Sequence, residues 1–177
     1  MNFATEKKNF LTKKDKSTKA SIDEDIKDLL DSINKNPDYY TTSSCSGRIV
    51  LLNTEDKKRS TWLFVSHEPI KELPIQEKSY FLQEPIILHI ACRNLEAAKK
   101  LLQIANEIGL GKSGIISLEK IIVELKGTER IETIVTPDLP EDYLTLLIEE
   151  ANRKLQRTKE KIKKLKEKLS PLSKQGD

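Results

Sequence analysis

Short apolar runs that lie close together in the sequence, with long helical segments set apart from them, most limit what this chain can fold into. Such runs predict strands over residues 49–53, 61–65, 85–91, 114–118, 120–126 and 130–136. An amphipathic helix begins after Asn94 and ends at Gly109, and a long helix begins near Glu141. Gly127 predicts a hairpin between the last two strands.

This order gives three strands and a helix, twice, without a residue-by-residue repeat. Parallel βαβ units would alternate strands and helices more evenly, so the pattern predicts an α+β fold. We expect two three-strand-plus-helix repeats that form a mixed, largely antiparallel sheet with flanking helices, unlike a Rossmann fold. One domain is expected over residues 1–177, with N-terminal helices (1–36), a first half (37–110), a second half with the long helix (111–170) and a tail (171–177).

Two helices are predicted ahead of the first strand. The segment up to about Lys14 has weak helical character. Ser21 followed by Glu24 is a capping-box pattern, and the helix that it opens stops before Pro37. In the last helix Ala151 and Thr158 interrupt a heptad of apolar residues, which favours packing on the domain over a coiled coil.

The net charge of +3 hides an uneven distribution. Residues 1–19 hold six lysines against two acids, and residues 153–170 hold nine basic residues against two acids. Residues 20–152 hold 15 basic and 23 acidic residues. Basic ends around an acidic middle fit a polyanion held by the flanks, although a solvated lysine-rich helix surface gives the same pattern.

Composition also limits the class of protein. No run approaches the roughly 18 apolar residues of a membrane span, and the first residues do not form a signal peptide. Cys45 and Cys92 are too few for a disulfide framework, so we expect a thiol-reduced, cytoplasmic protein.

A hydroxyl-rich run over residues 39–48 is the strongest candidate for a site. Six consecutive hydroxyl or thiol side chains end at Gly47 and Arg48, and the apolar run 49–52 follows directly. We expect these small donors and the fixed cation to lie at the mouth of a buried strand and to hold a charged ligand. A serine-rich turn is the plain alternative.

Other motifs are weaker. The segment 111–113 lacks the earlier glycine of a phosphate-binding loop, and no Gly-x-Gly-x-x-Gly occurs. His67 and His89 are too isolated for a zinc site but are candidate proton carriers, with a core histidine as the alternative for His89. Trp62 is either a core residue or a stacking platform for a purine, and Cys45 is a candidate nucleophile without a local partner.

Several blocks in order resemble the tRNA wybutosine-synthesising protein 3 family. The blocks are residues 39–49, 62–69, 84–93 and 112–115, with the opening segment 14–19 and the segment 151–155 in the last helix. Ala20 stands where a glycine is expected after the opening segment. The resemblance implies an S-adenosylmethionine-dependent methyltransferase with a fold unrelated to Rossmann methyltransferases. The implied acceptor is the N4 ring nitrogen of a demethylwyosine-type tricyclic guanosine next to the anticodon of phenylalanine tRNA.

Residue roles follow from this resemblance as hypotheses. The first candidate for the base that takes the acceptor's proton is His67, and the second is His89. The expected cofactor- or substrate-binding residues are Ser44, Cys45, Ser46, Gly47, Arg48, Trp62, Arg93, Ser113 and Gly114. The expected tRNA-binding residues are Lys13, Lys14, Lys19, Arg153, Lys154 and Arg157. A non-catalytic tRNA- or nucleotide-binding module and a thiol enzyme using Cys45 are the alternatives, and the oligomeric state, monomer or dimer, stays open.

Overall fold

Four helices and eight strands make up the parts of the chain that the computed structural model describes, residues 2–16, 26–56 and 59–169. The helices are α1 (Phe3–Lys16), α2 (Lys27–Lys35), α3 (Leu95–Glu107) and α4 (Glu141–Leu169). The strands are β1 (Tyr39–Cys45), β2 (Arg48–Asp56), β3 (Arg59–Ser66), β4 (Ser79–Glu84), β5 (Ile87–Cys92), β6 (Gly114–Ser117), β7 (Ile122–Lys126) and β8 (Ile131–Val135).

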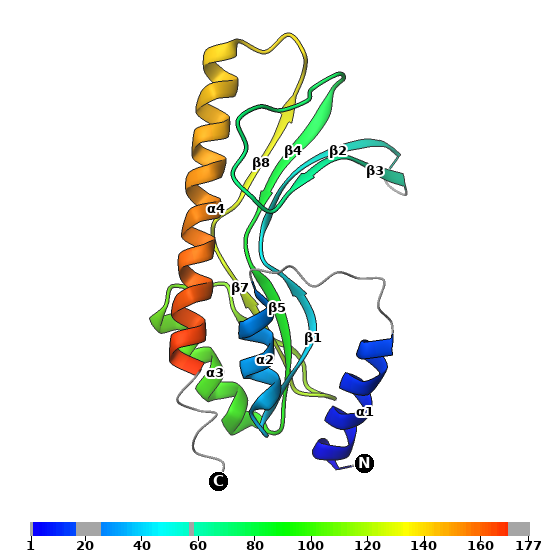
Figure 1. Cartoon of the computed structure of the whole chain (residues 1–177), viewed down its shortest axis with the longest axis vertical. Helices are drawn as coiled ribbons and strands as arrows, with labels where there is room; N and C mark the ends of the chain where they lie inside the picture. The colour runs from blue at the N-terminus through cyan, green and yellow to red at the C-terminus, as the bar shows by residue number, and fades with distance from the viewer. Residues whose placement is uncertain (1, 17–25, 57–58, 170–177) are drawn as a thin grey trace.

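The strands form two four-stranded sheets stacked end to end (Figure 1). The lower sheet has the order β1-β5-β7-β6, and the upper sheet has the order β3-β2-β4-β8. Every neighbouring pair is antiparallel. The α+β class and the difference from a Rossmann sheet are therefore confirmed.

Three chain segments pass from one sheet to the other at the same level, which we call the waist. The waist comprises Ser46–Gly47 between β1 and β2, Pro85–Ile86 between β4 and β5, and residues 127–130 between β7 and β8. Gly47 has φ +94°, a backbone conformation that side chains with a Cβ rarely adopt. A Cβ on Gly47 would lie 3.0 Å from the Glu84 carbonyl oxygen and 3.0 Å from Thr158 Cγ2, so only glycine fits there without strain.

The long helix α4 holds both sheets together from one side (Figure 1). Its first half adds Leu147, Ala151 and Leu155 to the core of the upper sheet. Its second half adds Ile162, Leu165 and Leu169 to the core of the lower sheet, which α2 and α3 also cover. Thr158 lies fully buried between the two halves, against Gly47. The small residues that interrupt the heptad therefore fit the sheets, and packing on the domain is confirmed.

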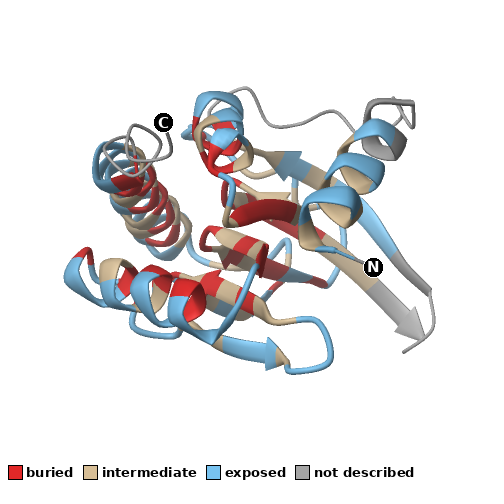
Figure 2. Cartoon of the chain, turned by 90° about the horizontal axis from the view of Figure 1, so that it is seen from below, coloured by how far each residue is buried: buried red, intermediate tan, exposed pale blue. Residues whose placement is uncertain are grey.

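The opposite side of the sheets, which we call the open face, is covered only in part. Phe3 and Phe10 of α1 pack on Tyr40, with ring centroids 5.4 Å and 5.3 Å apart. Seen from below, α1 lies across the lower sheet from α2, α3 and α4 (Figure 2). Among the described residues, no helix covers the open face of the upper sheet.

Several predicted elements are confirmed. The helix after Asn94 is present, and Asn94 Oδ1 accepts a hydrogen bond from Ala97 N at 2.9 Å. The long last helix and the predicted strands at 49–53, 61–65, 85–91, 114–118, 120–126 and 130–136 appear with small shifts of their ends. The capping box at Ser21 and Glu24 lies outside the described residues. No helix in the described ranges is long and apolar enough to cross a membrane.

Three predictions were wrong. The run 39–48 is not a strand mouth, because residues 39–45 form β1 and only Ser46 and Gly47 lie between two strands. The first half has five strands rather than three, since β1 and β4 were not expected. Gly127 does not mark a hairpin, because β7 and β8 pair with strands of different sheets.

Candidate active site at the waist

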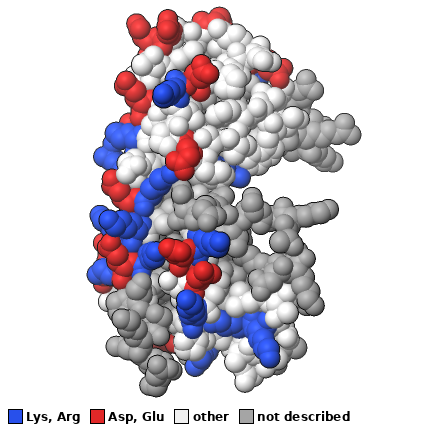
Figure 3. All heavy atoms as spheres, in the orientation of Figure 1, with Lys and Arg blue, Asp and Glu red and all other residues white. Residues whose placement is uncertain are grey.

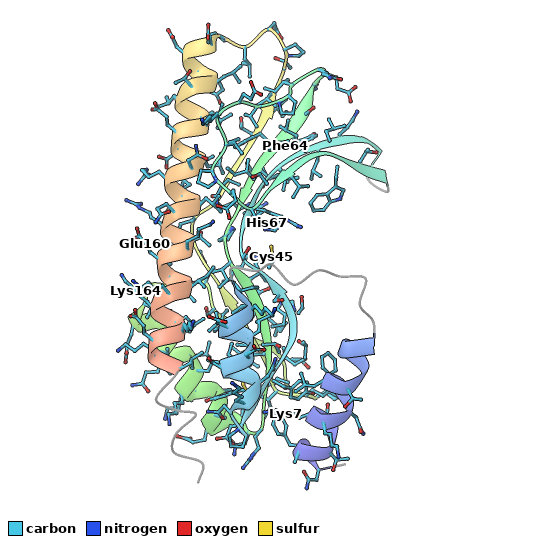
Figure 4. The ribbon with its side chains drawn as sticks, in the orientation of Figure 1. Lys7, Cys45, Phe64, His67, Glu160 and Lys164 are labelled. Atoms are coloured by element: carbon cyan, nitrogen blue, oxygen red, sulfur yellow. The ribbon has the colours of Figure 1, made fainter. Side chains whose placement is uncertain are left out.

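The turn between β1 and β2 holds the imidazole of His67. His67 directly follows β3, and its Nδ1 lies 3.0 Å from the carbonyl oxygen of Gly47 and 3.2 Å from Ser46 Oγ. Because a carbonyl oxygen only accepts hydrogen bonds, we assign the ring proton to Nδ1. Nε2 then carries the lone pair, which suits the imidazole to take a proton. Figure 4 labels His67 and Cys45 close together at the level of the waist.

Arg48 is fixed beside this histidine on the open face. Its Nε donates a hydrogen bond to Glu84 Oε2 at 2.6 Å, across the β2–β4 pair. Its guanidinium carbon lies 4.3 Å from the ring centroid of Trp62, which is 49% exposed. The arginine is therefore held by an acid and an aromatic ring, and its remaining N–H groups can meet an anionic group.

A β-bulge turns Trp62 toward this arginine. Phe64 pairs with Leu51 and packs in the upper core, whereas Trp62 pairs with Leu52 after a register shift. Without the shift, residues two apart on a strand point to the same side. The extra residue, Leu63, thus places Trp62 on the open face rather than under α4.

A second histidine lies on the open face of the lower sheet. His89 Nε2 lies 3.0 Å from Glu124 Oε2, and both side chains are partly exposed. Strand register places Ser43, His89, Glu124 and Gly114 side by side on β1, β5, β7 and β6. Since the imidazole is partly exposed and paired with a carboxylate on the open face, the core alternative for His89 was wrong.

A cationic cavity lies between Glu124 of β7 and the third segment of the waist, residues 127–130. It has a volume of about 360 Å³ and is lined by Pro85, Lys112, Glu124, Lys126, Gly127, Thr128 and Arg130. Three of the lining residues are basic and one is acidic. Arg130 Nη2 lies 2.5 Å from Glu132 Oε2, so one of the three cations is partly neutralised. The cavity suits a small anionic molecule or group.

A mostly buried ion pair joins the third segment of the waist, residues 127–130, to α4. Lys161 Nζ lies 2.5 Å from Glu129 Oε1, with both side chains at most 16% exposed. Burial alone would raise the pKa of Glu129, but hydrogen bonds from Lys161 and from backbone N–H groups reverse this, so the pKa is lowered. The carboxylate is therefore charged at neutral pH and holds residues 127–130 against the helix.

The polar residues of β1 divide between the two faces of the sheet. Ser43 and Cys45 pair with His89 and Ile87 on the open face, whereas Ser44 pairs with the buried Leu88 under the helices. The structure therefore brings Cys45, and not Ser44, to the open face. Ser43 is a residue that the sequence did not single out.

Two residues of the second half differ in their roles. Ser113 Oγ donates to the Leu110 carbonyl oxygen at 2.7 Å and accepts from Lys126 N at 3.1 Å, so it fixes the entry to β6. Gly114 pairs with Glu124 next to His89 and is close to the cationic cavity. Of the two, only Gly114 lies side by side with His89 and Glu124 on the sheet.

Other predicted site residues lie away from the waist. Arg93 follows β5 at its far end, six residues from Ile87, which is about 20 Å along a strand. There it pairs with Asp38 at 2.9 Å. Arg153 and Arg157 are exposed on α4, which covers the opposite side of the sheets. The structure does not bring these three cations together with His67.

The remaining predicted tRNA contacts are only partly described. Lys154 is partly buried on α4, with its Nζ 3.7 Å from Glu150 Oε1. Lys13 and Lys14 lie in the last turn of α1, on the open side, but their side chains are outside the described residues. Lys19 lies outside the described residues altogether.

Sequence reasoning missed the acids of the site. Glu84 and Glu124 fix Arg48 and His89, yet each lies 35 or more positions from its partner. Glu84 could have been found by predicting the strand over residues 79–84, in which buried and more exposed positions alternate. This alternation was hidden because two polar residues, Ser79 and Gln83, occupy buried positions of that strand.

The chain is similar to known proteins along most of its length. A family model described as methyltransferase TYW3 matches residues 5–171. A protein of Archaeoglobus fulgidus, named tRNA(Phe) 7-((3-amino-3-carboxypropyl)-4-demethylwyosine(37)-N(4))-methyltransferase, is 38% identical over 169 residues, covering 88% of this chain and 86% of the relative. The tRNA wybutosine-synthesizing protein 3 homolog of Xenopus laevis is 34% identical over 179 residues, covering 90% of this chain and 71% of the relative. The solved structure of the PH1069 protein from Pyrococcus horikoshii has a TM-score of 0.86 at 34% identity, covering 95% of this chain and 96% of that one.

Proposed function

The chain belongs to the TYW3 methyltransferase family, and we infer that it is a tRNA(Phe) demethylwyosine N4-methyltransferase. The observation that carries this conclusion is the family match over residues 5–171. The enzyme transfers a methyl group to a ring nitrogen of the modified guanosine in phenylalanine tRNA. Such a transfer needs the acceptor nitrogen, the methyl carbon and the leaving atom in line, so positioning supplies much of the catalysis.

We propose S-adenosylmethionine as the methyl donor, bound in the cationic cavity. The volume of about 360 Å³ lies in the range of small-molecule sites. Lys112 and Lys126 suit the carboxylate of the donor, and Glu124 suits its amino group. When bound, the donor supplies an electrophilic methyl group on a sulfonium. Gly114, without a side chain, leaves room beside it.

We propose that the tricyclic base binds over the waist, next to Trp62. The exposed part of the indole offers a stacking surface, and Arg48 is placed to bind the carboxylate of an amino-carboxypropyl side chain on the base. The hydrogen bond between Glu84 and Arg48 fixes the direction of the guanidinium. Ser46 and Gly47 contribute by holding His67 in place.

His67 is the proposed base for the N4 proton. With Nδ1 donating to the Gly47 carbonyl oxygen, Nε2 is the atom that accepts the proton. His89, whose imidazole pairs with Glu124, is the second candidate. His67→Asn keeps a side-chain N–H for Gly47 but removes the basic nitrogen, so it should lower kcat about 10²- to 10⁴-fold.

Mass spectrometry of nucleosides tests the reaction. Incubation of the protein with phenylalanine tRNA that carries the unmethylated tricycle, and with S-adenosylmethionine, should yield the N4-methylated nucleoside. Arg48→Ala should abolish the product while the protein stays folded, and Lys100→Ala, an exposed cation on α3, should leave it unchanged. If Arg48→Ala forms as much product as the unchanged protein, Arg48 does not belong to the site. Calorimetry with the donor alone separates failure of donor binding from failure of transfer.

We propose that the basic N-terminal helix, rather than α4, contacts phosphates of the anticodon arm. α1 lies on the open side, whereas α4, which carries the exposed Arg153 and Arg157, lies on the other side of the sheets (Figure 1). Replacing Lys13 and Lys14 by Ala should lower the slope of log affinity against log salt by roughly 0.7 for each lost contact. Arg157→Ala should leave the slope unchanged, and the reverse result would move the tRNA to the α4 side.

A further inference from the structure

A row of apolar side chains lies exposed on the open face of the upper sheet. The row, which we call the aromatic row, consists of Trp62, Leu52, Tyr80 and Ile134, which are direct partners across β3, β2, β4 and β8. Tyr80 is 37% exposed, Ile134 is 47% exposed and Trp62 is 49% exposed. Three large apolar side chains side by side on one sheet face form a contiguous exposed patch.

The fold does not need this row for its core. The other face of the same strands supplies the buried residues Ile49, Leu51 and Phe81, which pack under α4. Within the described ranges, no helix packs on the aromatic row. In Figure 3 the upper part of the molecule beside α4 is mostly uncharged on the side that faces the viewer, whereas α4 carries mixed charges along its length. The exposed row therefore indicates a binding surface.

The charges along the lower border of the row indicate the kind of partner. Arg48 lies on the waist side and stacks on Trp62 while its Nε donates to Glu84. Arg130 pairs with Glu132, whose strand partner Leu82 lies two residues from Tyr80 on β4. Each guanidinium keeps further N–H groups that can meet a phosphate. Aromatic rings next to arginines are how proteins hold unpaired nucleotides, with bases on the rings and phosphates at the cations. The row is also continuous with the proposed site for the tricyclic base, because Trp62 belongs to both.

We propose that the aromatic row is a stacking platform for the single-stranded anticodon loop, in which Tyr80 stacks a base next to the modified guanosine. Trp62 and Tyr80 are separated by β2 and thus by about 10 Å, so each ring can hold its own base. The inference rests on the proposed function for the identity of the RNA. It gives the enzyme a contact with the loop sequence around the modified base.

The test is binding of the anticodon stem-loop of phenylalanine tRNA with an unmodified guanosine. Trp62 is the only tryptophan, so quenching of its fluorescence reports occupancy of the row directly. Tyr80→Leu keeps an apolar side chain but removes the ring, and it should weaken binding about 5- to 150-fold. Tyr80→Phe should bind within about twofold of the unchanged protein. Tyr143→Ala removes an exposed tyrosine at the start of α4 and serves as the matched control.

The outcomes separate this inference from the proposed function. Loop binding that depends on the Tyr80 ring supports the platform, whether or not the protein methylates tRNA. Methylation of full-length tRNA with a KM that is unchanged in Tyr80→Leu overturns the platform and leaves the reaction intact. A dimer in sedimentation that Tyr80→Leu converts to a monomer also overturns it, because the row would then be an interface between two copies.

Discussion

Replacing Gly47 by alanine should destabilise the protein through the waist, by both backbone strain and overpacking. The residue has φ +94°, and the added Cβ would lie 3.0 Å from both the Glu84 carbonyl oxygen and Thr158 Cγ2. A sparsely populated backbone conformation costs about 1–3 kcal/mol, and overpacking of a filled site costs a further 1–3 kcal/mol or so. We therefore expect a loss of roughly 2–6 kcal/mol in the free energy of unfolding.

Denaturant unfolding measures this loss, and a second variant shows its cause. Thr158→Ser removes Cγ2 but keeps the hydroxyl that donates to the Lys154 carbonyl oxygen at 3.1 Å. In this background Gly47→Ala should cost about 1 kcal/mol less, since one of the two close contacts is gone. Gly111→Ala is the control, because nothing lies within 4 Å of its Cβ position. A cost below about 0.5 kcal/mol for Gly47→Ala, or the same cost with and without Thr158 Cγ2, would refute the reasoning.

Three further predictions concern other parts of the molecule. Because the pKa of Glu129 is lowered, the stability it provides is present at neutral pH and is lost as the pH falls below about 5. Glu129→Gln should cost about 1–3 kcal/mol at pH 7 and flatten this acid dependence in unfolding experiments; an unchanged curve would contradict it. Burial raises the pKa of Cys92 to about 12, so iodoacetamide at pH 8 should alkylate it only after unfolding, as mass spectrometry would show. Asn152 bonds both N and O of Ile70 at 2.9 and 2.8 Å, so Asn152→Ala should cost about 1–3 kcal/mol and speed amide exchange at Ile70, with equal exchange as the contrary result.

Local signals in the sequence were enough for the helices and for most strands. The cap at Asn94 and the apolar stripe that follows it specify α3, because both are interactions within a few residues. The apolar run from Trp62 to Val65 specifies β3 in the same way. The resemblance carried by residues 39–49 and 62–69 identified the family, which the comparisons confirmed.

The elements that could not be predicted depend on partners far away in the sequence. β1 is rich in serine and threonine and resembles a loop, but its backbone pairs with β5, 42 to 53 positions later. β4 buries Ser79 and Gln83, so its alternation is not apolar against polar. The change of sheet at Gly127 is set by which strands pair with β7 and β8, and no local residue encodes that choice.

The waist explains why the candidate site lies where it does. Strands that leave one sheet for another must interrupt their ladders, so backbone groups become available to side chains at that level. The Gly47 carbonyl oxygen is one such group, and it accepts the hydrogen bond that orients His67. The same interruption allows Arg48 and Glu84 to face each other at the last paired position of β2 and β4. α4 packs against this level from the other side of the sheets, through Thr158 and Lys161. The groups proposed for methyl transfer therefore stand on backbone that is fixed by a long helix, which is what a reaction limited by positioning requires.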